Sequence, residues 1–120
     1  MAQYVDGFVL PIPADKLDAY TRIAKKAGKI WRKHGALDYF ECAGDDMDSP
    51  PMLSFTKLAK AKEGEIVIFA WAVFKSRAQR DKANAAIMKD EQLMGMCEES
   101  KSIVNCKRMA YGGFKVIVNA

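Results

Sequence analysis

Hydrophobic and polar positions follow two patterns along the chain, one typical of strands and one typical of helices. Residues 4–12 (YVDGFVLPI) and 66–74 (IVIFAWAVF) are short apolar runs that predict strands. Each run is followed by a helical pattern and then by another strand-like segment, at residues 37–43 and near residues 108–118. Strand–helix–strand, repeated once, predicts an α+β fold of the ferredoxin-like, split βαβ type, with an antiparallel sheet and helices on one face.

The first helical segment is the strongest local prediction. Pro11 and Pro13 end the preceding strand, because proline cannot continue a hydrogen-bonded ladder. Gly35 marks the end of the helix, since glycine readily adopts the left-handed conformation found there. Between these limits an apolar stripe recurs at every third or fourth residue: Leu17, Tyr20, Ala24, Ala27, Trp31 and His34.

The second helical segment predicts one longer and one short helix. Ser76 and Gln79 form a capping-box pattern, which opens a helix over residues 77–89. Asp90 has the side chain to cap a short helix that follows.

Two further segments are irregular. Residues 44–52 predict a loop rich in acids and prolines, and residues 53–58 predict a short extended piece or a turn. Gly112 and Gly113 interrupt the last strand pattern, which indicates a bulge, a close backbone approach or a tight hairpin.

The segment 66–74 is apolar on both faces, so both faces of its sheet need cover. The helices can cover only one face. We therefore expect a homodimer in which two sheets pack against each other as a dimeric α/β barrel. Residues 1–120 are expected to form a single domain of this kind.

Composition places the chain among globular proteins, with 50% hydrophobic and 28% charged residues. Its three cysteines are odd in number and contain no close pair, which is typical of free thiols in a cytosolic protein. We see no signal-peptide pattern, and the longest apolar run is too short to span a bilayer. The expectation is a cytoplasmic protein without a membrane partner.

Several runs of sequence are familiar. KAGKIWRKHGALDY (residues 26–39) and KRMAYGGF (residues 107–114) resemble the YbaA-like family, small bacterial proteins grouped as a domain of unknown function. The resemblance extends over nearly the whole chain and implies a ferredoxin-like subunit of the dimeric α/β barrel superfamily. That superfamily includes heme-degrading and cofactor-free monooxygenases, so the barrel interior is the place to look for a ligand. The resemblance implies no reaction, because one fold supports many chemistries.

Six residues are candidates for binding a small apolar or aromatic molecule. His34, the only histidine, is a candidate base or ligand, although we favour a residue that stabilises the end of its helix. Tyr39 and Glu41 share a strand face as an acid–phenol pair that could orient an aromatic or phenolic substrate. Alternatively, they satisfy one another across a dimer interface, or Glu41 points into solvent. The full candidate set is Asp6, His34, Tyr39, Glu41, Trp71 and Tyr111.

The sequence predicts neither a metal nor a cofactor. One histidine cannot supply a His-rich metal site, and the acidic stretch 44–48 lacks the spacing of a calcium loop. No phosphate-binding glycine loop or nucleophile motif is present. Whether the protein is an enzyme is left open by these patterns.

A binding function for nucleic acid is the alternative. Basic residues gather on one side of the first helix, and some YbaA-like proteins carry a label relating them to signal-recognition-particle RNA. No exposed aromatic residues are interleaved with these bases, so we favour a solvated helix face over an RNA site. A purely structural or partner-binding dimer is a third reading. The bases of the RNA alternative are Arg22, Lys25, Lys29 and Arg32.

Overall fold

The computed structural model describes residues 2–120, in which four strands form one antiparallel sheet of order β2-β3-β1-β4. The central strands β1 and β3 pair along their whole length, from Tyr4 opposite Phe74 to Pro13 opposite Glu65. This architecture confirms the predicted ferredoxin-like α+β fold. The strands are β1 (Tyr4–Pro13), β2 (Asp38–Ala43), β3 (Glu65–Phe74) and β4 (Ala110–Lys115).

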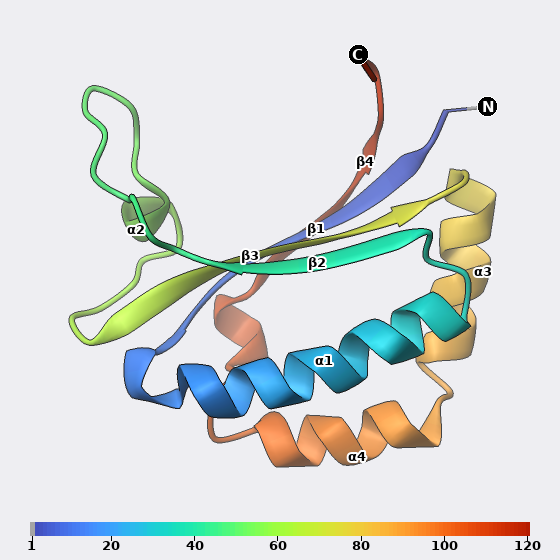
Figure 1. The fold of residues 1–120 in the computed structure, drawn as a ribbon, viewed down its shortest axis with the longest axis horizontal. Coiled ribbons are helices and arrows are strands. Elements are labelled where there is room, and N and C mark those ends of the chain that lie inside the picture. The colour runs from blue at the N-terminus through green and yellow to red at the C-terminus, as the bar shows by residue number, and fades with distance from the viewer. Residues whose placement is uncertain (1) are drawn as a thin grey trace.

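Three helices lie together on one face of the sheet, and a fourth, short helix lies apart from them beside one end of the sheet (Figure 1). Within residues 2–120, no helix combines the length and the apolar content needed to cross a membrane. The three covering helices are α1 (Leu17–Lys33), α3 (Arg77–Ile87) and α4 (Glu91–Ser100); the short helix is α2 (Phe55–Leu58), and two 3-10 turns are η1 (Ala14–Lys16) and η2 (Cys106–Arg108).

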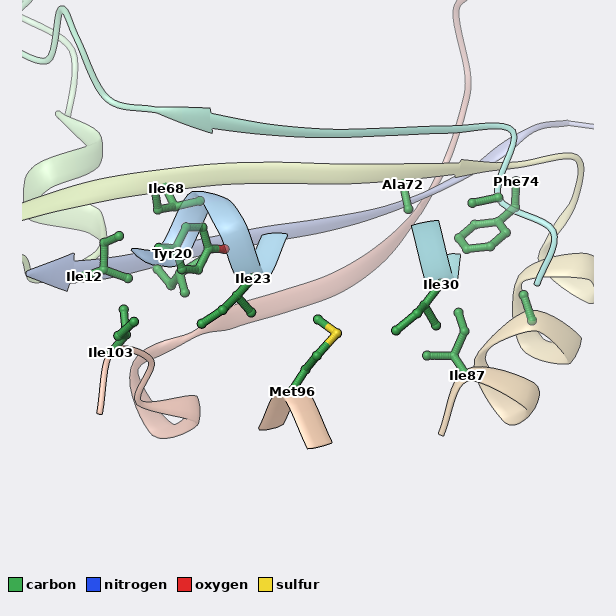
Figure 2. Packing of buried hydrophobic residues seen from close by; sticks show 13 residues of the cluster. Ile12, Tyr20, Ile23, Ile30, Ile68, Ala72, Phe74, Ile87, Met96 and Ile103 are labelled. Carbon is green, nitrogen blue, oxygen red and sulfur yellow. The ribbon is translucent and has the colours of Figure 1, made fainter. Parts of the chain in front are cut away.

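The hydrophobic core fills the layer between the sheet and the three covering helices. Figure 2 shows Ile23 and Ile30 of α1 and Met96 of α4 directed into this layer, with Ile68 and Phe74 of β3 beyond them. The predicted α1 stripe is confirmed for Tyr20, which is buried, but the stripe is broader than predicted, since Ile23 and Ile30 are also buried.

The predicted helix ends are mostly confirmed. The Ser76 hydroxyl accepts a hydrogen bond from the Gln79 N–H at 3.2 Å, and the Asp90 carboxylate accepts one from the Gln92 N–H at 2.9 Å. Gly35 follows α1 with a φ of +121°, a conformation that favours glycine. Helix α3 ends at Ile87, two residues before its predicted end.

Residues 53–58 do not form an extended piece. The Ser54 hydroxyl accepts a hydrogen bond from the Lys57 N–H at 3.1 Å and thereby starts helix α2.

The glycine pair produces a close approach and not a bulge. Strand β4 pairs with β1 without interruption through Gly112 and Gly113. A β-carbon at position 113 would lie 2.6 Å from the Tyr4 ring, so any larger residue there would require that ring to move. The strand is also shorter than predicted at both ends: the turn η2 occupies residues 106–108, and β4 ends at Lys115.

The opposite face of the sheet, here called the open face, is apolar and faces away from α1, α3 and α4; the short helix α2 contacts it through Phe55, which packs against Phe69. Alternation along the strands places Phe40, Phe69, Trp71 and Phe114 on this side. Trp71 stacks on Phe40 with ring centroids 5.0 Å apart and contacts Phe69 at 5.3 Å. Phe40, Phe69 and Phe114 are all exposed. The predicted two-sided apolar character of residues 66–74 is therefore present, and aromatic side chains on one of its sides are exposed.

Candidate functional site

A polar cluster centred on Glu41 lies between β2 and α1. The Tyr39 hydroxyl donates a hydrogen bond to one Glu41 carboxylate oxygen at 2.5 Å, and the Tyr20 hydroxyl donates to the other. Tyr39 and Glu41 therefore share a strand face as predicted, and that face is the one turned towards the helices. They satisfy one another within one chain, which removes the need for a contact across a dimer interface.

The two phenols of this Glu41 cluster are stable donors. Burial raises the pKa of Tyr20 and of Tyr39 above its usual value, and the negative charge of nearby Glu41 raises both further. Both hydroxyls consequently remain protonated at physiological pH. Because both hydroxyls donate to Glu41, the cluster presents hydrogen-bond acceptors to a bound molecule: the remaining lone pairs of the carboxylate and of the phenol oxygens.

Two hollows meet at the Glu41 cluster. The first, here called the outer groove, has a volume of about 740 Å³ and runs between α1 and β2. The second, here called the inner cavity, has a volume of about 210 Å³ and lies between the sheet and helices α1 and α4. Four residues line both hollows, so the cluster forms part of the wall between them: Tyr20, Ala24, Tyr39 and Glu41.

The inner cavity is mostly apolar. Phe8 and Leu10 of β1, Ile23 of α1, and Met96 of α4 contribute to its lining. Trp31 lines it as well, and its indole N–H is buried without a hydrogen-bond partner among residues 2–120. An aromatic molecule with one acceptor group would fit both the apolar lining and this unused donor.

Gly28 lets α1 approach β2 closely at this site. A β-carbon at position 28 would lie 3.0 Å from the Tyr39 ring. The ring instead packs against the helix backbone and contacts Trp31, with centroids 5.8 Å apart. This packing fixes the direction of the Tyr39 hydroxyl towards Glu41.

Asp6 and Tyr111 belong to a second cluster on the same face of the sheet, towards the β4 edge, whereas Glu41 lies on the β2 edge. Arg80 of α3 donates to Asp6 at 3.1 Å and to the Tyr111 hydroxyl at 2.9 Å, and its guanidinium lies 4.7 Å from the centre of the Tyr4 ring. Asn84 donates to Asp6 at 3.4 Å. Burial raises the pKa of Asp6, although the charge of Arg80 acts in the opposite direction. The Asp6 cluster joins α3 to the sheet.

His34 and Trp71 lie in two further places. The His34 imidazole Nε2 is 2.7 Å from an Asp90 carboxylate oxygen, so it links the end of α1 to the start of α4. His34 contributes to neither the outer groove nor the inner cavity. Trp71 lies on the open face. The six candidate residues are thus divided among four locations, and only Tyr39 and Glu41 line the two hollows.

The predicted basic residues of α1 lie mostly in the outer groove. Lys25, Lys29 and Arg32 line it together with Tyr39 and Glu41, whereas Arg22 does not. Within the described part of the chain, no three His, Cys, Asp or Glu side chains lie together as metal ligands would.

Several residues of these clusters have roles that the sequence pattern does not predict. The sequence pattern places Tyr20 in the apolar stripe of the first helix, and neither Arg80 nor Asn84 belongs to a motif. Asp90 was predicted only as a helix cap. Each acquires its partner through the tertiary fold, since Tyr20 and Glu41 are 21 positions apart and Arg80 and Asp6 are 74 apart.

Replacing Asp90 with asparagine should weaken the contact between α1 and α4. The hydrogen bond with His34 is the main cause that lowers the pKa of Asp90 to about 2. A carboxyl with a depressed pKa stabilises the fold above its unfolded value, about 4, and loses that contribution as the pH falls towards 2. We expect Asp90→Asn to lower the Tm by roughly 2–5 °C at pH 7, and the difference from the unmodified protein to shrink between pH 4 and pH 2.

Asparagine is as good a helix cap as aspartate, so this substitution tests the charge and keeps the cap. Thermal melts followed by circular dichroism across that pH range measure the effect. An equal Tm for both proteins at pH 7 would show that the His34–Asp90 contact contributes nothing to stability.

Comparison with known proteins connects this fold to one family and to several solved structures. Uncharacterized protein YbaA of Escherichia coli strain K12 is 39% identical over 117 residues, covering 98% of each chain, and YbaA of Shigella flexneri matches equally. A dimeric ferredoxin-like protein from an uncultured marine organism is similar with a TM-score of 0.65, at 10% identity and full coverage of both chains.

A second similar structure is that of SnoaB, described as a cofactor-independent oxygenase from Streptomyces nogalater. Its TM-score is 0.58 at 12% identity, with 99% of this chain and 97% of SnoaB covered. These structural likenesses agree with the observed ferredoxin-like fold. The sequence model described as "Protein of unknown function (DUF1428)" matches residues 3–103. Since that match spans most of the chain and YbaA is similar throughout, the chain belongs to the DUF1428 family.

Proposed function

We propose that this protein is a cytosolic homodimer in which each subunit binds a small aromatic or phenolic molecule at the Glu41 cluster. One observation carries the proposal: the Glu41 carboxylate, held by Tyr20 and Tyr39, lies in the wall shared by the outer groove and the inner cavity. A ligand hydroxyl can donate to a remaining lone pair of this carboxylate, because each of its oxygens can accept two hydrogen bonds. The apolar cavity behind the cluster then receives the ring.

The size and lining of the inner cavity support a ligand of one aromatic ring. Its volume is about 210 Å³, and an apolar cavity of about 150 Å³ is known to hold benzene. This space lies on the helix side of the sheet, so the ligand would enter each subunit separately. SnoaB, with a similar fold, is described as an oxygenase that needs no cofactor. For this chain we propose binding and assign no reaction.

The open face supports the homodimer. Its exposed aromatic side chains form an apolar surface of the kind that marks an interface. A second copy presenting the same face would cover it, with the two sheets opposed. The similar protein from the marine organism is described as dimeric, which agrees with this assembly.

Glu41→Gln should weaken the binding of p-cresol, used here as a neutral phenol probe. The substitution keeps the side-chain shape and removes the charge that strengthens a hydrogen bond from the phenol. A hydrogen bond to a charged group contributes about 1.5–3 kcal/mol, so we expect a loss of affinity of roughly tenfold or more. Isothermal titration calorimetry measures the affinity, and a thermal melt checks that the variant is folded.

His34→Gln is the control for this experiment, since His34 lines neither hollow. It should leave p-cresol binding unchanged. Toluene should bind less well than p-cresol to the unmodified protein, because it has no hydroxyl for Glu41. If p-cresol does not bind, or if Glu41→Gln binds it equally well, the proposed site is wrong and a purely structural dimer becomes the better account.

A further inference from the structure

We infer that the ligand of the Glu41 cluster is an aromatic acid with a ring hydroxyl, and that Lys25 and Lys29 bind its acidic group. This inference rests on the proposed function and specifies its ligand class. The acidic group would lie in the outer groove, while the ring occupies the inner cavity. The hydroxyl would donate to Glu41 at the boundary between the two.

The helix places the two lysines on the same side. Lys25 and Lys29 are four residues apart, so their side chains are neighbours on the surface of α1, separated by about 6 Å along its axis. Both line the outer groove, and so do Tyr39 and Glu41 from the facing strand. One groove therefore has ammonium groups on its helix side and the Glu41 cluster on its strand side.

Lys25 and Lys29 are also uncompensated bases of the outer groove. Within residues 2–120, neither forms an ion pair, whereas Lys26 pairs with Glu99 at 3.9 Å and Lys33 pairs with Asp90 at 3.4 Å. The charges of these two other lysines are thus already balanced by α4 and the residue preceding it.

The other charged side chains of the outer groove already have partners within the chain. Arg32 lies 3.6 Å from Asp38 and also donates to the Leu37 carbonyl. The Glu41 oxygens each accept a tyrosine hydroxyl. The two lysines therefore remain as groups that can pair with an added anion, and Glu41 remains a negative centre that repels one.

This distribution of charge selects both a ligand and its orientation. An acidic group close to Glu41 would be repelled, while the same group beside Lys25 and Lys29 would be attracted. A hydrogen-bond donor is favoured at the Glu41 end for the opposite reason. A ring in the inner cavity that carries a hydroxyl and, meta to it, a short carboxylate chain satisfies both requirements at once, because both substituents then leave the ring towards the outer groove.

The test compares two probes that differ in charge: 3-(3-hydroxyphenyl)propionate and its primary amide. We expect the unmodified protein to bind the acid about tenfold more tightly than the amide at low ionic strength, because two partly exposed ion pairs contribute modestly. Lys25→Gln/Lys29→Gln should abolish this preference and leave the affinity for the amide unchanged. Added salt should reduce the preference, since exposed charges are screened.

Lys26→Gln/Lys33→Gln is the matched control, because it removes two charges from the same helix at positions outside the outer groove. It should retain the tenfold preference. Calorimetric titration of all three proteins with both probes gives the comparison.

The outcomes separate this inference from the proposed function. If the amide binds as tightly as the acid, or if the control double variant loses the preference equally, the lysines do not select the ligand, although the Glu41 site stands. If p-cresol binds and the acid does not, the inference is again overturned. If none of the three probes binds, the proposed function itself fails.

Discussion

Replacing Phe69 with aspartate is expected to convert a homodimer of this protein into a folded monomer. Phe69 lies on the open face, in contact with Trp71 of the same strand and with Phe55 of α2 at a centroid distance of 5.8 Å. In a symmetric face-to-face dimer, the substitution would place two unpaired carboxylates inside one apolar interface. Sedimentation velocity at micromolar concentration distinguishes the two states.

The expected effect is large because the interface contains the position twice. A central aromatic residue of an interface commonly contributes 2 kcal/mol or more, so two copies should raise the dimer Kd by about 100-fold or more. The fold of the subunit should survive, since Phe69 is 42% exposed within the chain. Its loss removes some aromatic packing on the sheet surface, at a cost of up to roughly 1 kcal/mol.

Met88→Asp provides the matched control. Met88 is an exposed apolar residue at the end of α3, away from the open face, with 71% of its surface accessible. It introduces the same charge and should leave the oligomeric state unchanged. A monomer in the unmodified protein, or a stable dimer of Phe69→Asp, would remove the open face as the subunit interface.

The fold could be predicted because its signals are local. The apolar periodicity of α1, the capping residue Ser76 and the turn glycine Gly35 each act within a few positions of the chain. The two-sided apolar strand also indicated that one face would be uncovered. The sequence leaves alternatives open where a tertiary contact decides the local structure, as at Gly113, where the Tyr4 ring lies close to the backbone and the strand pairing continues without a bulge.

The candidate site was predictable only for residues that are neighbours on one strand. Tyr39 and Glu41 lie two positions apart, so strand alternation alone places them on the same face. Tyr20 contacts Glu41 from another element, and neither the α1 segment nor the β2 segment alone determines how the two are positioned against each other. For the same reason, the sequence does not predict that Asp6 contacts Arg80. The sequence-based candidate set contains Trp71 together with the acidic residues, although the alternation of side chains along β3 directs Trp71 to the open face.

Replacing Arg80 with methionine should produce the largest loss of stability of any substitution considered for this chain. Asp6 is fully buried, and Arg80 is its ionic partner at 3.1 Å. Methionine keeps much of the apolar length of the arginine side chain and removes its charge. The Asp6 carboxyl would then remain buried without a cation, which commonly costs about 3–5 kcal/mol.

The loss should depend on pH in a defined direction. Burial already raises the pKa of Asp6, and Arg80 opposes this shift. Removing Arg80 should raise the pKa further, so the folded variant would hold a proton that the unfolded chain releases above about pH 4. When the pKa of a group is higher in the folded state than in the unfolded chain, its contribution to the stability of the fold is lost as the pH increases through the folded-state pKa. The variant should therefore be less destabilised at pH 4 than at pH 8.

Two further variants identify the cause of this effect. Arg77→Met removes an arginine one turn earlier on α3, where its pairing with Asp81 at 3.8 Å is exposed, and it should cost less than about 1 kcal/mol. Asp6→Asn combined with Arg80→Met removes both charges and should recover a large part of the stability, since an uncharged pair leaves no buried ion. Urea unfolding at both pH values measures all three proteins. If Arg80→Met and Arg77→Met cost the same, or if the double variant recovers nothing, the buried Asp6–Arg80 pair does not stabilise the attachment of α3 to the sheet.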